Sequence, residues 1–193
     1  PHSYSSAASD VYKRQSLVIA MGEAGLLGSF GAAGLVPSRI EEAIQTIQTS
    51  LPEGPYAFNL IHSPAEDAIE RAAAELFLKH QVKTVEASAF LDLTPHIVHY
   101  RVNGLSQGPG EQIMIGNRVI AKISRSEVAE KFMRPPPERI LAKLVQENRI
   151  TETQARLASR VPMADDITVE ADSGGHTDNR PLVSLLPSIL SLR

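Results

Sequence analysis

The fold is decided by the stretch PYAFNLIHSPAEDAIERAAAELFLKHQVKTVEASAF, residues 55–90. The stretch reads as an apolar strand, a helix and a second apolar strand, at 56–61, 64–80 and 84–90. Ser63 and Glu66 have the spacing of a helix capping box, with Pro64 at the first helical position. Short, nearly uniform apolar strands joined by a helix are typical of parallel pairing.

The same alternation of helix and strand signals continues in both directions. A helix opening at Pro37 has one apolar face, made of Ile40, Ala43, Ile44 and Ile47. Further strands are expected at 119–123 and 167–171, and further helices near 17–24, 138–148, 152–159 and 182–192. Helix starts are marked by Thr94 with Pro95, Ser124 with Glu127, and Thr151 with Gln154. A loop rich in Gly, Gln and Pro covers about 103–116. The alternation predicts an α/β fold with a parallel sheet.

Each predicted strand carries one polar residue late in an otherwise apolar run. These residues are Asn59, Glu86, Lys122 and Glu170. Burying an unpaired amide or charge is costly, and the carboxyl ends of parallel strands are where α/β enzymes build their sites. Two interpretations stay open here: a shared pocket, or structural pairing such as that of Lys122 with Glu170.

Residues 170–181, EADSGGHTDNRP, carry the densest set of chemically active side chains. Gly174 and Gly175 allow the backbone to turn with a positive φ or to approach a ligand closely. His176 then follows at the mouth of the sheet, where an imidazole suits proton donation or a hydrogen bond to a carbonyl. A histidine after glycines is more often an ordinary loop residue, so its neighbours decide the interpretation.

Composition narrows the class of protein. The 193 residues are 42% hydrophobic and 21% charged, with a net charge of -3 and no cysteine. These values indicate an ordinary globular chain, with no sign of a nucleic-acid or membrane partner. The lack of cysteine excludes disulfides, thiolate metal sites and a cysteine nucleophile, and fits a cytoplasmic protein.

Both ends of the sequence read as incomplete. Residues 1–15 are Ser-rich, without a hydrophobic period, and are interpreted as a non-native or disordered tail. Residues 16–193 are interpreted as part of a folded domain, and the last helical pattern stops without a cap at Arg193. Glycines recur every three residues from Gly22 to Gly34, which we interpret as close helix–strand packing in preference to a phosphate loop, because the P-loop lysine is missing.

At residues 166–182, DITVEADSGGHTDNRPL resembles the strand–GGH turn of the nitronate monooxygenase and FMN-type enoyl reductase superfamily. The full 17-residue string is similar to the PfaD branch of that superfamily. This branch comprises the enoyl reductases of polyunsaturated fatty-acid and trans-acyltransferase polyketide synthases. Four further blocks resemble that branch in the same order, and PPPE at 135–138 fits as well. The blocks are AMGEAGLLGSFGAAGL, PYAFNLIHSP, VEASAFLDLTP and NRVIAKISRSEVA, at 20–35, 55–64, 85–95 and 117–129.

The resemblance implies that residues 16–193 are the amino-terminal part of an FMN-binding (β/α)8 TIM-barrel domain, and that this partial barrel is truncated at both ends. It implies that His176 is the proton donor or carbonyl-orienting group. It also implies that Asn59 and Lys122 contact the flavin, and that Glu170, Gly174 and Gly175 line the same face. The string EADSGGH departs from the EAGGH-like pattern of the wider superfamily, so a role for Asp172 is not assigned.

The implied reaction is reduction of an enoyl thioester on acyl carrier protein, with NADPH as the reductant that supplies the flavin. Synthase components are the implied partners, and a homodimer is left open. The chain by itself is expected to be inactive and prone to aggregate, since a half-barrel exposes sheet edges.

Two alternatives accompany this interpretation. The first is a nitronate monooxygenase-like flavin oxidoreductase. The second is a hydrolase using a divalent metal, because carboxylates suit Mg²⁺ or Mn²⁺. Its ligands would come from Asp165, Asp166, Glu170, Asp172, His176 and Asp178.

Overall fold

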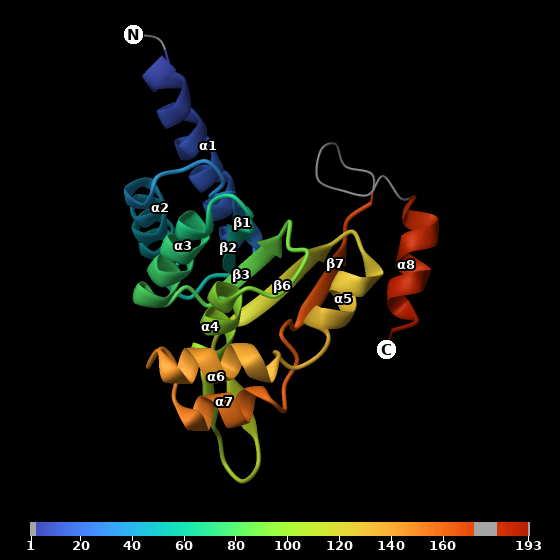
Figure 1. Cartoon of the computed structure of the whole chain (residues 1–193). Helices are drawn as coiled ribbons and strands as arrows, with labels where there is room; N and C mark the ends of the chain where they lie inside the picture. Colours follow the sequence, from blue (N-terminus) through green and yellow to red (C-terminus); the bar gives the residue numbers. More distant parts are fainter. Residues whose placement is uncertain (1–2, 172–180, 193) are drawn as a thin grey trace.

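A five-stranded parallel sheet forms the centre of the computed structural model, which describes residues 3–171 and 181–192 (Figure 1). The strands lie in the order β1-β2-β3-β6-β7, and every neighbouring pair is parallel. Their bounds are β1 Gly28–Phe30, β2 Tyr56–Ile61, β3 Thr84–Ser88, β6 Arg118–Ile123 and β7 Asp166–Val169. Spatial order follows chain order, which confirms the α/β parallel architecture predicted from the alternating pattern.

Helices precede and follow the strands of the sheet along the chain. Those of the described part of the chain are α1 Ser3–Glu23, α2 Pro37–Ser50, α3 Asp67–Lys79, α4 Pro95–Asn103, α5 Ser126–Phe132, α6 Glu138–Gln146, α7 Glu152–Ala158 and α8 Leu182–Leu190. Helix α1 packs on β1, the pairs α2–α3 and α3–α4 are in contact, and α8 packs against α5 and β7. The buried face of α2 is the predicted set Ile40, Ala43, Ile44 and Ile47. Among the described residues no helix combines the length and apolarity needed to cross a membrane.

The two faces of the sheet differ sharply in character. One face carries Phe58, Val85, Val119 and Ala121, all fully buried. Side chains alternate along a strand, so the neighbouring positions point to the opposite face. The strand register places polar residues on that second face: Asn59, Glu86, Ser88, Lys122 and Thr168. The sheet therefore presents a hydrophobic side to the helices and a polar side away from them.

Two of the three predicted capping boxes are wrong. Helix α3 begins at Asp67, because residues 63–66 form a turn in which the Glu66 N–H donates to the carbonyl of Ser63 at 3.0 Å. Helix α5 begins at Ser126, and its N-cap Arg125 makes no side-chain capping bond. The box of Thr151 and Gln154 is confirmed, with both reciprocal hydrogen bonds present.

Two segments that were predicted to be irregular contain regular secondary structure. The predicted loop at 103–116 contains an antiparallel hairpin, β4 Leu105–Gln107 with β5 Ile113–Ile115. Three-residue strands are too short to leave a periodic pattern. Helix α1 extends back to Ser3, so much of the stretch predicted to be a disordered tail is helical. Its non-native origin stays a prediction, as does closure of the sheet into a barrel.

The glycine series is explained by packing at two of its positions. A Cβ on Gly28 would lie 2.9 Å from the Cα of Val18, so helix α1 approaches strand β1 closely there. A Cβ on Gly22 would collide with Leu51. Gly25 and Gly34 have open space but positive φ angles of 74° and 72°, which favour glycine.

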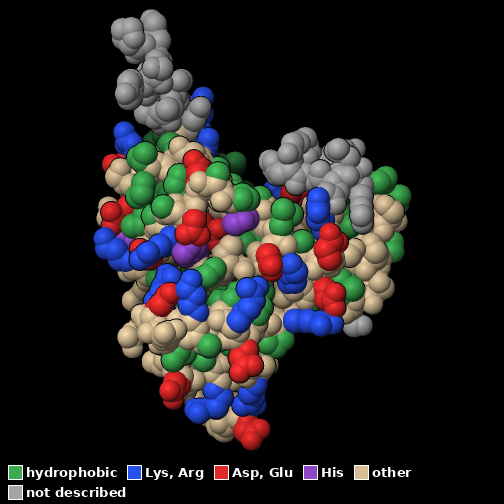
Figure 2. All heavy atoms as spheres, in the orientation of Figure 1, with side chains coloured by type: hydrophobic (Ala, Val, Ile, Leu, Met, Phe, Trp, Pro, Cys, Tyr) green, Lys and Arg blue, Asp and Glu red, His purple; other side chains and the backbone are tan. Residues whose placement is uncertain are grey.

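Hydrophobic side chains gather over α8 at the edge of the molecule (Figure 2). Leu182, Val183, Leu186 and Leu190 are 48%, 84%, 38% and 50% exposed. On the rest of this view, acidic and basic side chains are interspersed, in keeping with the small net charge.

Candidate functional site

A pocket of about 360 Å³ lies at the carboxyl ends of the strands. Its lining includes His62 after β2, Phe90 after β3, Lys122 on β6, Arg125 before α5 and Glu170 after β7. This end of a parallel sheet is where α/β folds place their ligands, because successive strand–helix loops converge there. The pocket is therefore the candidate functional site.

Lys122 and Glu170 meet in this pocket. The Lys122 ammonium lies 3.1 Å from Oε1 of Glu170, and the two side chains are 30% and 16% exposed. The two interpretations left open by the sequence are thus compatible, because the residues pair with each other and also line a common cavity. An ion pair of partial exposure contributes little to stability, so its position matters more than its energy.

Asn59 lies deeper on the polar face, next to strand β3. Its side chain donates to Oγ of Ser88 at 2.8 Å, and to Oε1 and the backbone carbonyl of Glu86 at 3.2 Å each. The residue is only 8% exposed. The amide therefore ties β2 to β3 on the polar face of the sheet, and its predicted contact with a flavin stays a prediction.

The GGH turn falls outside the part of the chain that the structure describes. Gly174, Gly175 and His176 belong to that stretch, as do Asp172 and Asp178. The roles that the resemblance implies for them remain predictions. Strand β7 ends at Val169, directly before Glu170, so the chain enters this turn from the carboxyl end of the sheet.

The described members of the proposed metal cluster do not meet. Asp165 is held by Arg101, whose Nη1 donates to Oδ2 at 2.7 Å and whose Nη2 donates to Oδ1 at 3.2 Å. Asp166 begins β7, whereas Glu170 follows its other end. Among the residues that the structure describes, no group of three metal-ligating side chains is found. The described part of the chain therefore gives no support to the hydrolase alternative.

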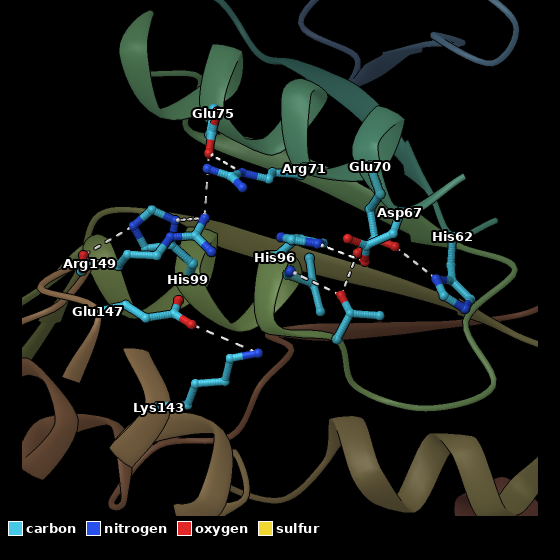
Figure 3. A network of polar contacts seen from close by, with 12 residues as sticks. His62, Asp67, Glu70, Arg71, Glu75, His96, His99, Lys143, Glu147 and Arg149 are labelled. Atoms are coloured by element: carbon cyan, nitrogen blue, oxygen red, sulfur yellow. Dashed lines mark hydrogen bonds and ion pairs between the residues drawn. The ribbon is translucent and has the colours of Figure 1, made fainter. Parts of the chain in front are cut away.

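A chain of polar groups that the sequence patterns did not predict lies beside the pocket (Figure 3). Nδ1 of His62 lies 2.7 Å from Oε2 of Glu70, and the Thr94 hydroxyl donates to the other carboxylate oxygen. Glu70 is on α3 and its side chain is 1% exposed. A signal was present in the sequence, since His62 directly follows the apolar run AFNLI. The helix pattern alone did not show that Glu70 faces inward.

A second cluster of the same view lies away from the pocket, between α3, α4 and the loop after α6 (Figure 3). Nη2 of Arg149 donates to Nδ1 of His99 at 3.0 Å, and Nε2 of His99 donates to the Arg149 carbonyl at 3.1 Å. Burial, together with the Arg149 charge, lowers the pKa of His99 from 6.5 to about 4. His99 is therefore a neutral structural residue near pH 7.

His96, on the preceding turn of α4, has a mixed environment. Its Nε2 lies 2.9 Å from Oδ1 of Asp67. Its Nδ1 is buried and is the one such side-chain atom without a hydrogen-bond partner among the described residues. It is not among the residues that line the pocket, so we assign it no functional role.

Comparison with known proteins points to biosynthetic synthases. The chain is 53% identical over 190 residues to a subunit of the polyunsaturated fatty acid synthase of Thraustochytrium sp., covering 98% of the chain and 13% of the relative. It is 47% identical over 180 residues to the polyketide biosynthesis protein PksE of Bacillus subtilis, covering 93% of the chain and 24% of that protein. No protein-family model matches the chain.

Several solved structures are similar to the chain, and one of them is similar in both fold and sequence. It is the enoyl reductase domain of MlnA, from the macrolactin biosynthesis cluster of Bacillus amyloliquefaciens, with a TM-score of 0.88 and 36% identity. The match covers 95% of this chain and 41% of that domain's chain. The chain thus spans only a minor part of each of these proteins. It is homologous to segments of polyunsaturated fatty-acid and polyketide biosynthesis proteins, and it shares the fold of part of an enoyl reductase domain.

Proposed function

We propose that the chain is part of an FMN-dependent enoyl reductase that reduces enoyl thioesters on acyl carrier protein during polyunsaturated fatty-acid or polyketide biosynthesis. The observation that carries the proposal is the 0.88 TM-score at 36% identity to an enoyl reductase domain. The polar pocket at the carboxyl ends of the strands supports it, since this is where such a fold binds cofactor and substrate. In this proposal the sheet continues into a (β/α)8 barrel.

The charged pair Lys122 and Glu170 in the pocket supports a flavin as the proposed cofactor. Bound FMN would supply hydride transfer between NADPH and the enoyl double bond. Lys122 would place a cation where negative charge develops on the reduced ring, and Glu170 would hold that ammonium in place. Asn59 would offer its amide from the floor of the same face. Gly174 and Gly175 would let the backbone approach the ring, and His176 would orient the thioester carbonyl.

The partners follow from the substrate. An acyl chain attached to a carrier protein requires docking of acyl carrier protein near the pocket mouth. The synthase relatives support an assembly of this kind. A homodimer is compatible with the proposal and is tested by the mass of the purified protein in solution.

The test is an absorbance spectrum of the complete protein that contains this chain, before and after NADPH is added. The proposal expects a visible flavin band that bleaches with NADPH and returns when an enoyl thioester is supplied. His176→Ala should still bleach but recover slowly, because that residue would act on the thioester. A colourless protein that cannot be loaded with FMN would exclude the proposed function.

A further inference from the structure

The end of β2 carries a histidine whose position is fixed on three sides. His62 lies one residue beyond the end of β2, and its backbone N–H donates to the carbonyl of Ser88 at 3.0 Å. Its ring stacks on Phe90, with 5.3 Å between ring centroids and 27° between the planes. Its Nδ1 lies 2.7 Å from Oε2 of Glu70 (Figure 3). His62 is itself one of the residues that line the pocket.

The carboxylate that holds His62 is buried to an unusual degree. The Glu70 side chain is 1% exposed, and its second oxygen accepts the hydroxyl of Thr94, which also caps α4. Glu70 lies in the first turn of α3, where the helix dipole favours negative charge. Burying a carboxylate is costly, and an apolar side chain often serves stability as well or better. Its distinct effect here is to orient His62.

This contact assigns the two ring nitrogens. An ionised carboxylate only accepts hydrogen bonds, so Nδ1 carries the hydrogen that reaches Glu70. Nε2 is left for the pocket, and it has no hydrogen-bond partner among residues 3–171 and 181–192. A buried carboxylate that fixes the tautomer and direction of an imidazole is a recurrent arrangement in acid–base catalysis.

We propose that His62 is the proton donor of this site and that Glu70 is its positioning residue. The inference rests on the proposed enoyl reduction. When hydride from the reduced flavin, itself supplied by NADPH, reaches the β-carbon, the electron pair of the double bond moves to the α-carbon. Solvent first delivers a proton to Nε2 of His62, the α-carbon then takes that proton, and the ring returns to its Nδ1–H form. One hydride and one proton saturate the bond.

The test separates the two half-reactions in the complete flavoprotein that contains this chain, using His62→Gln, Glu70→Gln and a matched control. The control is His80→Gln. Nε2 of His80 lies 2.7 Å from Glu41, and its side chain is 17% exposed against 19% for His62, but it does not line the pocket. Flavin reduction by NADPH should be unchanged in all three variants. Reoxidation by the enoyl thioester should slow about 100-fold in His62→Gln, and about 10-fold in Glu70→Gln.

A second measurement requires neither turnover nor a folded His62 variant. Nitrogen-15 NMR of the flavin-free protein should show His62 with its proton on Nδ1, and Glu70→Gln should weaken this preference. An unprotonated Nδ1 in the wild type would overturn the proposal, as would His62→Gln that is reoxidised at the wild-type rate. A wild-type protein whose flavin NADPH does not reduce would instead sink the proposed function, and this inference with it.

Discussion

The ammonium of Lys122 on β6 lies 3.1 Å from Oε1 of Glu170, just past the end of the neighbouring strand β7, inside the pocket. Replacing the lysine leaves a negative charge beside the proposed flavin site. We expect Lys122→Met to slow flavin reduction by NADPH roughly 10- to 100-fold, because charge on the reduced ring loses its counter-ion. Stopped-flow absorbance measures this rate.

Lys143→Met is the matched control for that experiment. Lys143 is 60% exposed and lies 3.8 Å from Glu147 on the surface of α6. Its loss should leave the rate unchanged. Equal rates in the two variants would exclude a role for Lys122 in flavin reduction.

Asn59 should contribute to stability independently of any cofactor. Asn59→Ala leaves the buried Ser88 hydroxyl and the Glu86 carbonyl without their amide donor. We expect a loss of about 1–3 kcal/mol in the free energy of unfolding, measured by urea denaturation. The exposed Asn103→Ala should change it by less than about 0.5 kcal/mol. A neutral Asn59→Ala would mean that its hydrogen bonds are replaced by water.

Arg101 is the largest fully buried side chain of the described residues, and its guanidinium joins three segments. It donates to Asp165, to the carbonyl of Asn117 and to the carbonyl of Pro162. Arg101→Met should cost about 3–5 kcal/mol of unfolding free energy, because Asp165 is left as an unpaired charge.

The lysine variant sharpens this prediction about Arg101. Arg101→Lys should recover only part of the loss, since an ammonium lacks the planar fork of donors. Arg39→Met, at a side chain 53% exposed and paired with Glu42, should be nearly neutral. Full recovery in Arg101→Lys would show that charge alone matters at this position.

His99 should make stability fall in mild acid. Its pKa is lowered to about 4, chiefly by burial and then by Arg149. The unfolded imidazole takes up a proton near pH 6.5 and the folded one resists until about pH 4. Stability from this residue is therefore intact above about pH 6.5 and is lost as the pH falls toward 4.

The size of this loss is roughly 1–2 kcal/mol, after allowance for partial solvent screening. His99→Gln keeps a donor for the Arg149 carbonyl and cannot be charged. Urea denaturation at a series of pH values from about 7.5 down to about 4.5 should give a flatter curve for this variant. Parallel curves for the two proteins would contradict the assignment.

Several elements of the fold could be predicted because their information is local. The face of α2, the strand at Tyr56–Ile61 and the cap at Thr151 depend on residues within a few positions of one another. The predicted caps at Ser63 and Ser124 were wrong because a turn at 63–66 precedes α3, and because α5 begins only at Ser126, after its N-cap Arg125. Local patterns do not reveal such competition.

The residues of the candidate site likewise differ in whether the local sequence revealed them. The late polar positions in the strands indicated Lys122 and Glu170, because a charge in an apolar strand is anomalous in the sequence itself. Nothing local marked Glu70, whose contacts with His62 and Thr94 span 8 and 24 residues.

The sequence by itself determined the alternation of strands and helices, and hence a parallel sheet with polar residues at its carboxyl edge. Period and turn chemistry are properties of neighbouring residues, so they can be read directly. Only the tertiary structure decided that His62, Glu70 and Thr94 form one hydrogen-bonded chain, and that Asp165 serves Arg101 in place of a metal. Those pairings depend on how α3 and α4 pack beside β2 and on where β7 begins, and burial decides which carboxylates must find a partner.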